Sequence, residues 1–412
     1  MICISAPSNQ KLSGEVVLPS SKSMSNRLLI MKALSDGRVS INKLSDADDT
    51  QILKSILHRS DKEIDVGDAG TAMRFLTAYF ANRSGEWILH GSNRMNFRHI
   101  GPLVDALNQL GADIEFLNEK GYPPIKIKGR PLEGGKINIR ADLSSQYISA
   151  LMMIGPKMKH GLVLDLQGNV LSYPYIEMTA GLMRQCGVRI DMTPKKIIIH
   201  PGEYGQRTLI VEPDWSAASY WYEMAAISEN AEITLSGLSA DSLQGDKVLV
   251  EIFEQLGVSS HMVNGNMVIR KSNLGFILPE TFHYNFSNCP DLAQTLAVTC
   301  ATLNVPSKLE GLANLPIKET DRINALVTEL SKMGASVVNI PNEGIGISPQ
   351  RGKLRLSSKP IATYGDHRMA LAFSPVALKT KSICLDQSNV VKKSYPGYWD
   401  DLKKFNFTIH KT

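Results

Sequence analysis

Basic and hydroxyl-bearing side chains gather at the starts of four segments that the sequence predicts to be helices. These starts are Lys22-Ser23-Met24-Ser25-Asn26-Arg27, Gly70-Thr71-Ala72-Met73-Arg74, Ser144-Ser145-Gln146 and Asp366-His367-Arg368. A helix N-terminus has free backbone N–H groups and a partial positive charge, so it attracts anions. Capping needs only one Ser, Thr, Asp or Asn, and cations are usually favoured at the opposite helix end. Each start alone is compatible with simple capping, but the four together predict a site for anionic ligands.

The helices that carry these starts belong to a repeat. Four segments show a helical apolar period, a glycine and then an alternating strand, and their glycines are Gly111, Gly187, Gly257 and Gly334. A glycine directly after such a helix is a common signal for its end. A second series consists of aspartates that recur in the same phase, each at the start of a further helical segment. They are Asp142, Asp214, Asp291 and Asp366. Aspartate suits the N-cap and the first turn of a helix.

Both series recur every 70 to 77 residues. Two earlier helix starts, in SSKSMSNRLLIMKAL and AGTAMRFLTAYFA, bring the number of units to six, or about 69 residues each in a chain of 412. Short strands lie between the helices, in PPIKIKG, GKINIRAD, KKIIIHPG and RTLIVEPD. The sequence therefore predicts an α/β fold of repeated β/α units, with helices packed against mixed sheets.

Composition excludes several classes of protein. Hydrophobic residues make up 43% and charged residues 21%, which is ordinary for a globular chain and excludes disorder. The net charge is +5 without a long run of like charge, so nucleic-acid binding is not expected. No apolar stretch is long enough to span a membrane, and no secretory leader is visible. We expect a cytoplasmic protein that binds neither nucleic acid nor membrane.

The cysteines and histidines predict neither disulfides nor a metal site. The cysteines are odd in number and form no C-x-x-C pair, so reduced, mostly buried thiols are expected at Cys3, Cys186, Cys289, Cys300 and Cys384. The nine histidines include no H-x-x-x-H pair, so no zinc site is expected either.

Seven motifs occur in one order along the chain: LPSSKSMSNRLL, GDAGTAMRFL, SSQY, SYPYIEMT, IKETDR, YGDHRMAL and KKSYPGY. This order, from about residue 11 to residue 400, resembles that of the 5-enolpyruvylshikimate-3-phosphate synthases. The resemblance implies two domains of three similar β/α units each, with the active site in the cleft between them. A discontinuous domain, residues 1–20 and 214–412, would carry Asp291, Glu319, Arg368 and Lys393. An inserted domain, residues 21–213, would carry Arg74, Arg98, Ser144 and Gln146.

The reaction that this resemblance implies is a transfer of the enolpyruvyl group of phosphoenolpyruvate to the 5-hydroxyl of shikimate 3-phosphate. It releases phosphate on the route to chorismate and the aromatic amino acids. A monomer without cofactor or metal is implied, with glyphosate competing for the phosphoenolpyruvate site. Each substrate carries a carboxylate and a phosphate of about −1.5 to −2, so the pair brings roughly −5 to −6. Eight cations, seven of them in these motifs and Arg98 between two of them, suit two such anions: Lys22, Arg27, Arg74, Arg98, Lys318, Arg322, Arg368 and Lys393.

The resemblance also assigns roles residue by residue. The chemistry needs a base, an acid and cations around the leaving phosphate, and the matching catalytic residues are Asp291, Glu319 and Lys22. Asp291 could equally be a plain N-cap. Residues implied for shikimate 3-phosphate are Lys22, Ser23, Arg27, Ser144, Ser145, Gln146, Ser172, Tyr175, Asp291, Asn314 and Lys318. Those implied for phosphoenolpyruvate are Lys22, Gly70, Arg98, Gln146, Arg322, His367, Arg368 and Lys393.

Four features depart from the family pattern. Ser20 replaces a usual glycine, Asp68 a common asparagine, and His99 the proline that usually follows the arginine. The stretch 50–66 is short, so we expect a trimmed strand there. Asp68 matters most, because a carboxylate near an anion site weakens binding unless it points away. At Gly70, glycine could serve either an unusual φ or the close approach of a ligand to the backbone.

Two other functions are compatible with parts of this pattern. The UDP-N-acetylglucosamine enolpyruvyl transferases share the implied fold, but they usually have Asn after the first lysine and a reactive cysteine on a mobile loop. Here Ser23 follows Lys22, and no cysteine lies between Cys3 and Cys186. A non-catalytic anion-binding relative is the second alternative. It would have no use for carboxylates such as Asp291 and Glu319, which repel an anionic ligand.

Overall fold

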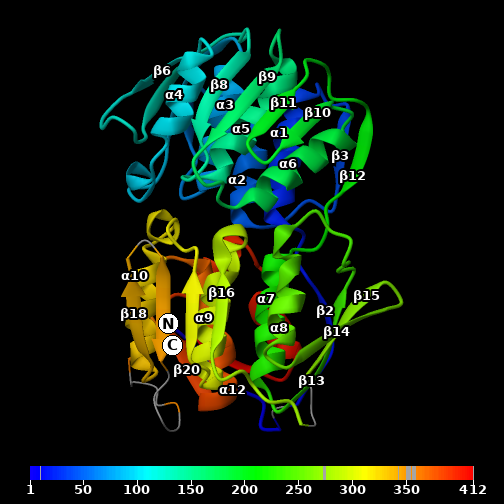
Figure 1. Ribbon diagram of the computed structural model, residues 1–412, viewed down its shortest axis with the longest axis vertical. Helices are drawn as coiled ribbons and strands as arrows, with labels where there is room; N and C mark the ends of the chain where they lie inside the picture. Colours follow the sequence, from blue (N-terminus) through cyan, green and yellow to red (C-terminus); the bar gives the residue numbers. More distant parts are fainter. Residues whose placement is uncertain (10, 272–274, 342, 349–353, 355–358, 412) are drawn as a thin grey trace. The chain divides into compact units, whose positions relative to one another are not determined.

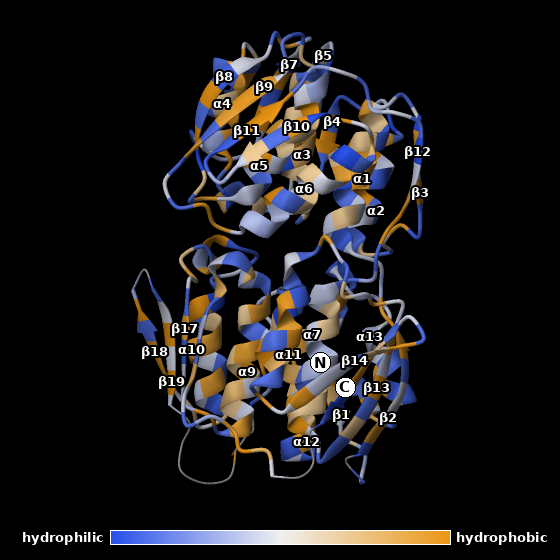
Figure 2. Cartoon of the chain, turned by 45° about the vertical axis from the view of Figure 1, so that its right-hand side comes forward, coloured by the Kyte–Doolittle hydropathy of each residue, from blue (hydrophilic) through white to orange (hydrophobic). Residues whose placement is uncertain are grey.

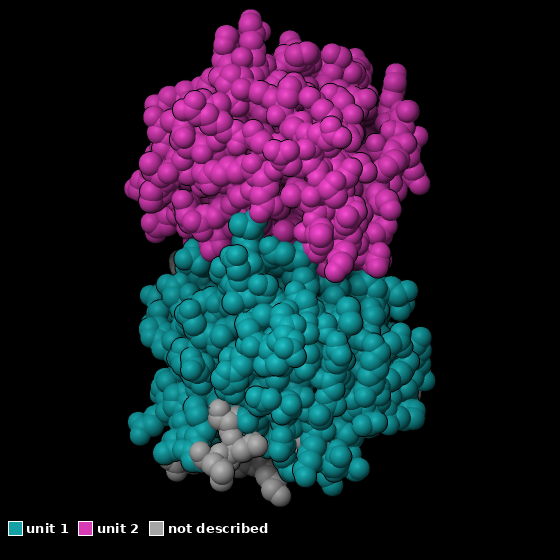
Figure 3. Space-filling model, turned by 90° about the vertical axis from the view of Figure 1, so that its right-hand side faces the viewer, with its two compact units in different colours: residues 1–19, 212–412 teal, residues 20–211 magenta. Residues whose placement is uncertain are grey.

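The computed structural model describes residues 1–412 except 10, 272–274, 342, 349–353, 355–358 and 412. The chain divides into two compact units (Figure 3). Unit 1 contains Met1–Pro19 and Glu212–Thr412, and unit 2 contains Ser20–Val211. The chain therefore leaves unit 1 after its first two strands and returns to it near the middle of the sequence.

Unit 2 contains two complete copies of a β-α-β-α-β-β repeat (Figure 1). The sheet of the first copy has the order β4-β5-β7-β6, and that of the second β8-β9-β11-β10. The first copy comprises β4 (Glu63–Asp65), α3 (Gly70–Ala81), β5 (Gly85–His90), α4 (Gly101–Gln109), β6 (Asp113–Phe116) and β7 (Ile125–Gly129). The second comprises β8 (Gly135–Arg140), α5 (Ser145–Ile154), β9 (Leu162–Gln167), α6 (Tyr173–Gln185), β10 (Ile190–Thr193) and β11 (Lys196–Ile199). Parallel and antiparallel pairs occur in both sheets, as predicted.

The third copy in unit 2 is shorter. It contains α1 (Lys22–Leu34), β3 (Val39–Asn42), α2 (Asp48–Leu57) and β12 (Arg207–Ile210), and its sheet is the parallel pair β12-β3. After α2 the chain runs directly into β4 of the next copy, without the hairpin that the other two copies have. Where the sequence predicts one trimmed strand in the short 50–66 stretch, this copy has two strands fewer than the others.

Unit 1 repeats the same pattern three times. The first copy is β2 (Lys11–Val17), α7 (Trp215–Ile227), β13 (Asn230–Ser236), α8 (Leu249–Glu254), β14 (Val258–Val263) and β15 (Asn266–Lys271). The second is β16 (Phe282–Asn285), α9 (Ala293–Leu303), β17 (Ser307–Glu310), α10 (Arg322–Lys332), β18 (Ser336–Ile340) and β19 (Gly344–Ser348). The third contains α11 (His367–Phe373), α12 (Ala377–Thr380), β20 (Ser382–Leu385), α13 (Tyr398–Lys404) and β21 (Thr408–Lys411), completed by the N-terminal strand β1 (Ile2–Ser5).

The four predicted glycine signals end helices as expected. Gly111, Gly187, Gly257 and Gly334 follow α4, α6, α8 and α10, with φ values of +94°, +86°, +82° and +86°. A positive φ is strained for any residue with a Cβ, so glycine suits each of these turns. The chain can therefore leave each helix sharply and enter the next strand.

The core of each unit is a trio of helices that contact one another. In unit 2 these are α1, α3 and α5, and in unit 1 they are α7, α9 and α11. Every residue of α11 and all but Ser216 of α7 are buried, so these helices have no face toward solvent. Apolar residues, orange in Figure 2, gather along the inner helices and strands. The motif residues at the starts of these helices are thus held on rigid, buried elements.

The cysteine prediction is wrong for one pair. Cys3 lies directly opposite Cys384 in the antiparallel pair of β1 and β20, and the two form a disulfide. They are 381 residues apart in sequence, so no local spacing could reveal that the first strand completes the last sheet. Cys186, Cys289 and Cys300 are free and buried, as expected. Among the described residues, no helix is long and apolar enough to cross a membrane.

Candidate active site

Arg322 is the centre of an ionic network in unit 1. It is the first residue of α10, and only 1% of its surface is exposed. Its guanidinium nitrogens lie 2.7 Å from Asp366, 2.8 Å from Glu319 and 3.2 Å from Asp291. Burial by itself would lower the pKa of Arg322, but these three carboxylates outweigh burial and raise it. A buried charge is costly unless it is paired, so the carboxylates are what makes this position tolerable for an arginine.

Arg368 holds Asp291 from a second side. Its Nη2 atom lies 2.8 Å from the carboxylate of Asp291, and its Nη1 atom donates to the Asp291 backbone oxygen at 3.1 Å and to the Tyr220 hydroxyl at 3.4 Å. Arg368 is in the first turn of α11, where Asp366 accepts its backbone N–H at 2.8 Å. The starts of α10 and α11 and the residues before α9 therefore meet at one place in unit 1.

The charge balance keeps Asp291 ionised in the free protein. Burial would raise the pKa of the Asp291 carboxyl, but the positive charges of Arg368, Lys318 and Arg322 hold it well below its ordinary range. A carboxylate in this state is a weak base, because its cations stabilise the ionised form. An anionic ligand that engages the same cations would reduce that stabilisation and raise the proton affinity of Asp291.

The sequence predicts the recurring aspartates at N-caps or first turns; two of the four are N-caps, and Asp291 lies in the first turn of a 3-10 segment. Asp214 caps α7 by accepting the Ala217 N–H, and Asp366 caps α11. The cap of α5 is Ser144, whereas Asp142 pairs with Arg140 at 2.9 Å. Asp291 does not cap α9, because it lies in the short 3-10 segment η5 (Pro290–Leu292) before that helix. Its carboxylate is engaged by the two arginines instead, so the plain N-cap interpretation of Asp291 is wrong.

The remaining predicted residues of unit 1 lie around this network. Lys393 donates to the backbone oxygen of Gly365 at 3.0 Å, just before Asp366. His367 is buried in α11, with its Nδ1 atom 3.8 Å from Asp366. Asn314 is buried at the start of the 3-10 segment η6 (Leu315–Ile317), and Lys318 follows that segment. The charge of Lys318 acts on Asp291, so it belongs to the same cluster.

In unit 2, Lys22 opens α1 and forms an ion pair with Asp49, which lies in the first turn of α2. The distance between Lys22 Nζ and Asp49 Oδ2 is 3.2 Å. Sequence reasoning missed Asp49, because acidic residues in a first turn, here Asp48 and Asp49, are an ordinary helix signal. The pair fixes the direction of the Lys22 ammonium relative to the start of α1.

The guanidinium of Arg27 is buried and hydrogen-bonded to other residues of unit 2. Four of its five N–H groups donate within unit 2, to Thr179 at 2.7 Å, to Ser149 at 3.1 Å and to the backbone oxygens of Ser23 and Tyr175 at 2.9 and 3.3 Å. Burial lowers its pKa to about 10. These bonds tie α1 to α5 and α6. Its implied contact with shikimate 3-phosphate stays a prediction.

Gly70 makes room for the guanidinium of Arg98. Gly70 is the first residue of α3 and does not have a positive φ. A Cβ at this position would overlap the guanidinium atoms of Arg98, whose Nη1 atom donates to the Asp68 backbone oxygen at 3.2 Å. The unusual φ offered by the sequence is therefore wrong, and the close approach of a ligand stays a prediction. In the free protein a cationic side chain occupies the space beside this glycine.

The carboxylate of Asp68, the most doubtful of the departures, accepts a hydrogen bond from the Ser92 hydroxyl. Arg74 donates to the backbone oxygens of Gly70 at 3.1 Å and of His99 at 2.9 Å. Arg74 therefore supports both the start of α3 and the loop that carries Arg98.

The start of α5 is joined to the start of α3. Gln146 donates to the Thr71 hydroxyl at 3.2 Å, and Ser145 is the first residue of α5. Ser172 lies just before α6 with φ +55°, and Tyr175 lies in the first turn of that helix. The structure thus brings the predicted residues of unit 2 to the starts of α1, α3, α5 and α6.

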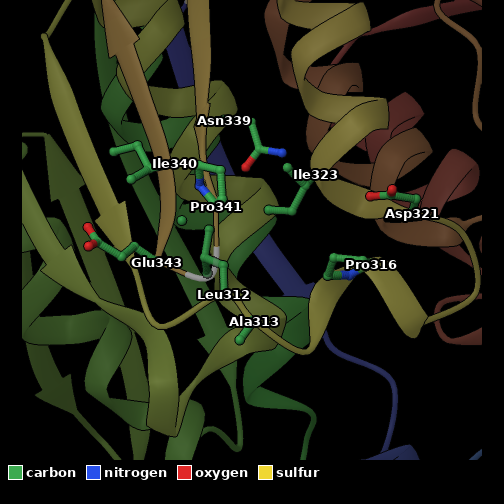
Figure 4. Close-up of a pocket in the computed structure, with 10 residues that line it drawn as sticks. Leu312, Ala313, Pro316, Asp321, Ile323, Asn339, Ile340, Pro341 and Glu343 are labelled. Atoms are coloured by element: carbon green, nitrogen blue, oxygen red, sulfur yellow. The ribbon is translucent and has the colours of Figure 1, made fainter.

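A separate cavity of about 240 Å³ lies beside the start of α10 (Figure 4). Its lining includes the carboxylates of Asp321 and Glu343 and none of the predicted site residues. Such a lining does not suit anionic substrates. Over the part of the chain that the structure describes, no group of three or more His, Cys, Asp or Glu side chains could hold a metal ion.

Both units are α/β bodies of repeated β/α units with arginines and lysines at helix starts, an arrangement that suits anionic ligands. Residues 7–59 and 52–402 match the family model of EPSP synthase (3-phosphoshikimate 1-carboxyvinyltransferase). A 3-phosphoshikimate 1-carboxyvinyltransferase of Bacteroides fragilis is 46% identical over 408 residues, which cover 98% of both chains. One of Colwellia psychrerythraea is 35% identical and covers 95% of this chain and 96% of its own. The chain therefore belongs to the EPSP synthase family of transferases.

A solved structure supports the fold. The EPSP synthase from Acinetobacter baumannii superposes with a TM-score of 0.76 at 20% identity, and the match covers 100% of each chain. The predicted fold class of repeated β/α units is therefore confirmed.

The buried network predicts a large effect of removing Arg322. In the Arg322→Met variant, Asp366, Asp291 and Glu319 would lose a shared counter-ion. We expect the free energy of unfolding at pH 7 to fall by about 3–5 kcal/mol, the usual scale for a broken buried ion pair, as measured by urea denaturation. The matched control is Lys308→Met, which breaks an ion pair with Glu310 at the surface. This variant should leave the urea concentration at the midpoint of unfolding unchanged. Equal midpoints for both variants and the unmodified protein would contradict a stabilising role of the network.

Proposed function

We infer that this protein transfers the enolpyruvyl group of phosphoenolpyruvate to the 5-hydroxyl of shikimate 3-phosphate and releases phosphate. Membership of the EPSP synthase family supports this reaction. The structural observation that carries the proposal is the Asp291 carboxylate held between Arg322 and Arg368. The cationic side chains that pair with this base in the free protein can also bind anionic substrates. Such an arrangement suits a reaction between two anions.

Asp291 acts as the base for the 5-hydroxyl in this proposal. In the free protein its proton affinity is low, because Arg368, Lys318 and Arg322 stabilise the carboxylate. Bound phosphate and carboxylate groups would share those cations, and the pKa of Asp291 would then rise toward a value useful for proton transfer. The base would thus become effective when the substrates are present.

Glu319 and Lys22 complete the proposed chemistry. Glu319 shares Arg322 with Asp291 and would exchange a proton with the methylene carbon of the enolpyruvyl group. Lys22, paired with Asp49, would contact both substrates and carry the proton to or from them. Cations around the phosphate that leaves would stabilise its developing charge; those proposed are Arg98, Arg322, Arg368 and Lys393.

The two units would each supply part of this site. We assign shikimate 3-phosphate mainly to the starts of α1, α5 and α6 together with Asp291, Asn314 and Lys318. Phosphoenolpyruvate would bind Gly70, Arg98 and Gln146 of unit 2 together with Arg322, His367, Arg368 and Lys393 of unit 1. Family resemblance further supports a cytoplasmic monomer that glyphosate inhibits.

A phosphate-release assay with two acceptors tests the reaction. With phosphoenolpyruvate present, shikimate 3-phosphate should support continuous release, whereas UDP-N-acetylglucosamine should not. Release with the second acceptor would instead identify the related transferase. Heat protection by shikimate 3-phosphate without any release would identify a non-catalytic binding protein.

Asp291→Asn separates the base from the binding site. The amide keeps the shape of the side chain and an acceptor oxygen, but it can take up no proton. We expect kcat to fall by roughly 10²–10⁴-fold, the scale of a lost general base, while calorimetry still detects binding of shikimate 3-phosphate. The control is Asp142→Asn, at the equivalent place in the repeat, whose carboxylate pairs with Arg140; it should retain nearly normal kcat. Near-normal turnover of Asp291→Asn would remove Asp291 as the base.

Gly70→Ala tests the placement of Arg98. The added methyl group would displace the Arg98 guanidinium, the flexible end of a side chain, so stability should change little. KM for phosphoenolpyruvate should rise by roughly tenfold, the scale of a weakened hydrogen bond to a charged group, and glyphosate inhibition should weaken. KM for shikimate 3-phosphate should stay nearly unchanged. The control is Gly111→Ala, where φ is +94°; its strain should lower stability by about 1 kcal/mol without changing either KM. An equal rise of both KM values in Gly70→Ala would contradict this placement.

A further inference from the structure

Asp246 is a buried carboxyl that the proposed chemistry does not use. It lies in the 3-10 segment η3 (Gly245–Val248), directly before α8, and only 3% of its surface is exposed. Its Oδ2 atom accepts a hydrogen bond from the Ser216 hydroxyl in the first turn of α7. Its Oδ1 atom is also buried, and no hydrogen-bond partner for it is found among the described residues. A buried polar atom without a partner destabilises the folded state, so this carboxyl is costly to keep at this position.

Its position is held firmly beside the ionic network. The preceding loop is fixed by Gln244, which accepts the Trp215 N–H at 3.1 Å and donates to the Pro213 backbone oxygen at 2.8 Å. The helix α7 contacts both η3 and η5, and η5 carries Asp291. Ser216, whose hydroxyl bonds Asp246, and Tyr220, whose hydroxyl accepts from Arg368, lie one turn apart on α7. Asp246 and the Arg368–Asp291 ion pair therefore contact neighbouring turns of the same helix.

The groups that act on the charge of Asp246 lie on three other segments, η5, the start of α7 and α11. Burial and the negative charge of Asp291 raise the pKa of Asp246 to about 7, and Asp214 at the start of α7 adds to the rise. The Ser216 hydroxyl and Arg368 of α11 act in the opposite direction. Cys289, two residues before Asp291, is buried, and the nearby charge of Asp246 helps to raise its pKa, so the thiol is neutral. Asp246 therefore changes its ionisation in the neutral range of pH.

Coupling between two ionisable groups is reciprocal. If ionised Asp291 raises the proton affinity of Asp246, ionised Asp246 raises the proton affinity of Asp291 by the same free energy. We propose that Asp246 is a positioning residue whose ionised carboxylate strengthens Asp291 as the base for the acceptor hydroxyl. This inference rests on the proposed function, because it assigns Asp291 that role. In this proposal the negative charge of Asp246 partly offsets the effect of the cations, which lower the pKa of Asp291.

The test compares kcat/KM for shikimate 3-phosphate against pH in the unmodified protein and in Asp246→Asn. Ionisation of the substrates contributes equally to both profiles, so their ratio isolates Asp246. The ratio should be close to one near pH 5.5 and rise with a midpoint near pH 7. It should level off at several-fold to about tenfold, because a tenfold change in basicity is one pKa unit. A ratio that stays constant across this range would overturn the proposal.

Two further variants should move the midpoint in opposite directions without changing the final level. Ser216→Ala removes a hydrogen bond that favours the ionised carboxyl, so the step should move to higher pH. Asp214→Asn keeps a capping side chain at the start of α7 but removes a negative charge, so the step should move to lower pH. A purely structural role of Asp246 would produce neither displacement.

A direct titration keeps the inference separate from the proposed function. In protein labelled with ¹³C at the aspartate carboxyls, the signal lost in Asp246→Asn should titrate near pH 7 in the unmodified protein. The same signal should titrate at lower pH in Asp291→Asn, because the charge that raises its pKa is gone. An unshifted titration would refute the coupling, whether or not phosphate is released. Coupling without phosphate release would leave the pair intact and refute the proposed reaction.

Discussion

The burial of Arg322 among three carboxylates is the interaction on which the rest of the site depends. Asp291, Glu319 and Asp366 come from segments before α9, α10 and α11, and Arg322 joins all three. A single arginine thus fixes the relative positions of helix starts that are far apart in sequence. Since an unpaired buried charge is strongly unfavourable, the loss of any partner would disturb the others.

The same network explains how a highly charged site can exist without its substrates. Around Arg322, the cations Lys318, Arg322, Arg368 and Lys393 exceed the carboxylates Asp291, Glu319 and Asp366 by one charge. The protein's own carboxylates therefore take the place of anionic ligands. In the proposed reaction, binding is an exchange in which substrate anions share cations that Asp291 and Glu319 hold in the free protein. Such an exchange couples substrate binding to the proton affinity of the base.

The repeated unit gives this network its support. Three mutually contacting helices form the core of each unit, and the buried α7 and α11 leave little freedom for their first turns. The repeat also tolerates variation away from these starts. The α1–α2 copy has lost a hairpin and keeps only the β12-β3 pair, while Lys22 and Arg27 keep defined contacts within unit 2. In the third copy of unit 1, the N-terminal strand β1 pairs with β20 and β21 and completes the sheet.

The sequence by itself determined the elements of this fold. Local periodicity and backbone geometry, which depend on residues close in sequence, predict three kinds of feature. These are the helix starts, the alternating strands and the glycines after α4, α6, α8 and α10. Only the tertiary structure decided which distant groups meet. It paired Cys3 with Cys384 and turned Asp291 from a helix cap toward two arginines. It also brought Asp246 and Arg368 to neighbouring turns of α7 and filled the space at Gly70 with Arg98. These outcomes depend on contacts between residues tens to hundreds of positions apart, and no local pattern carries that information.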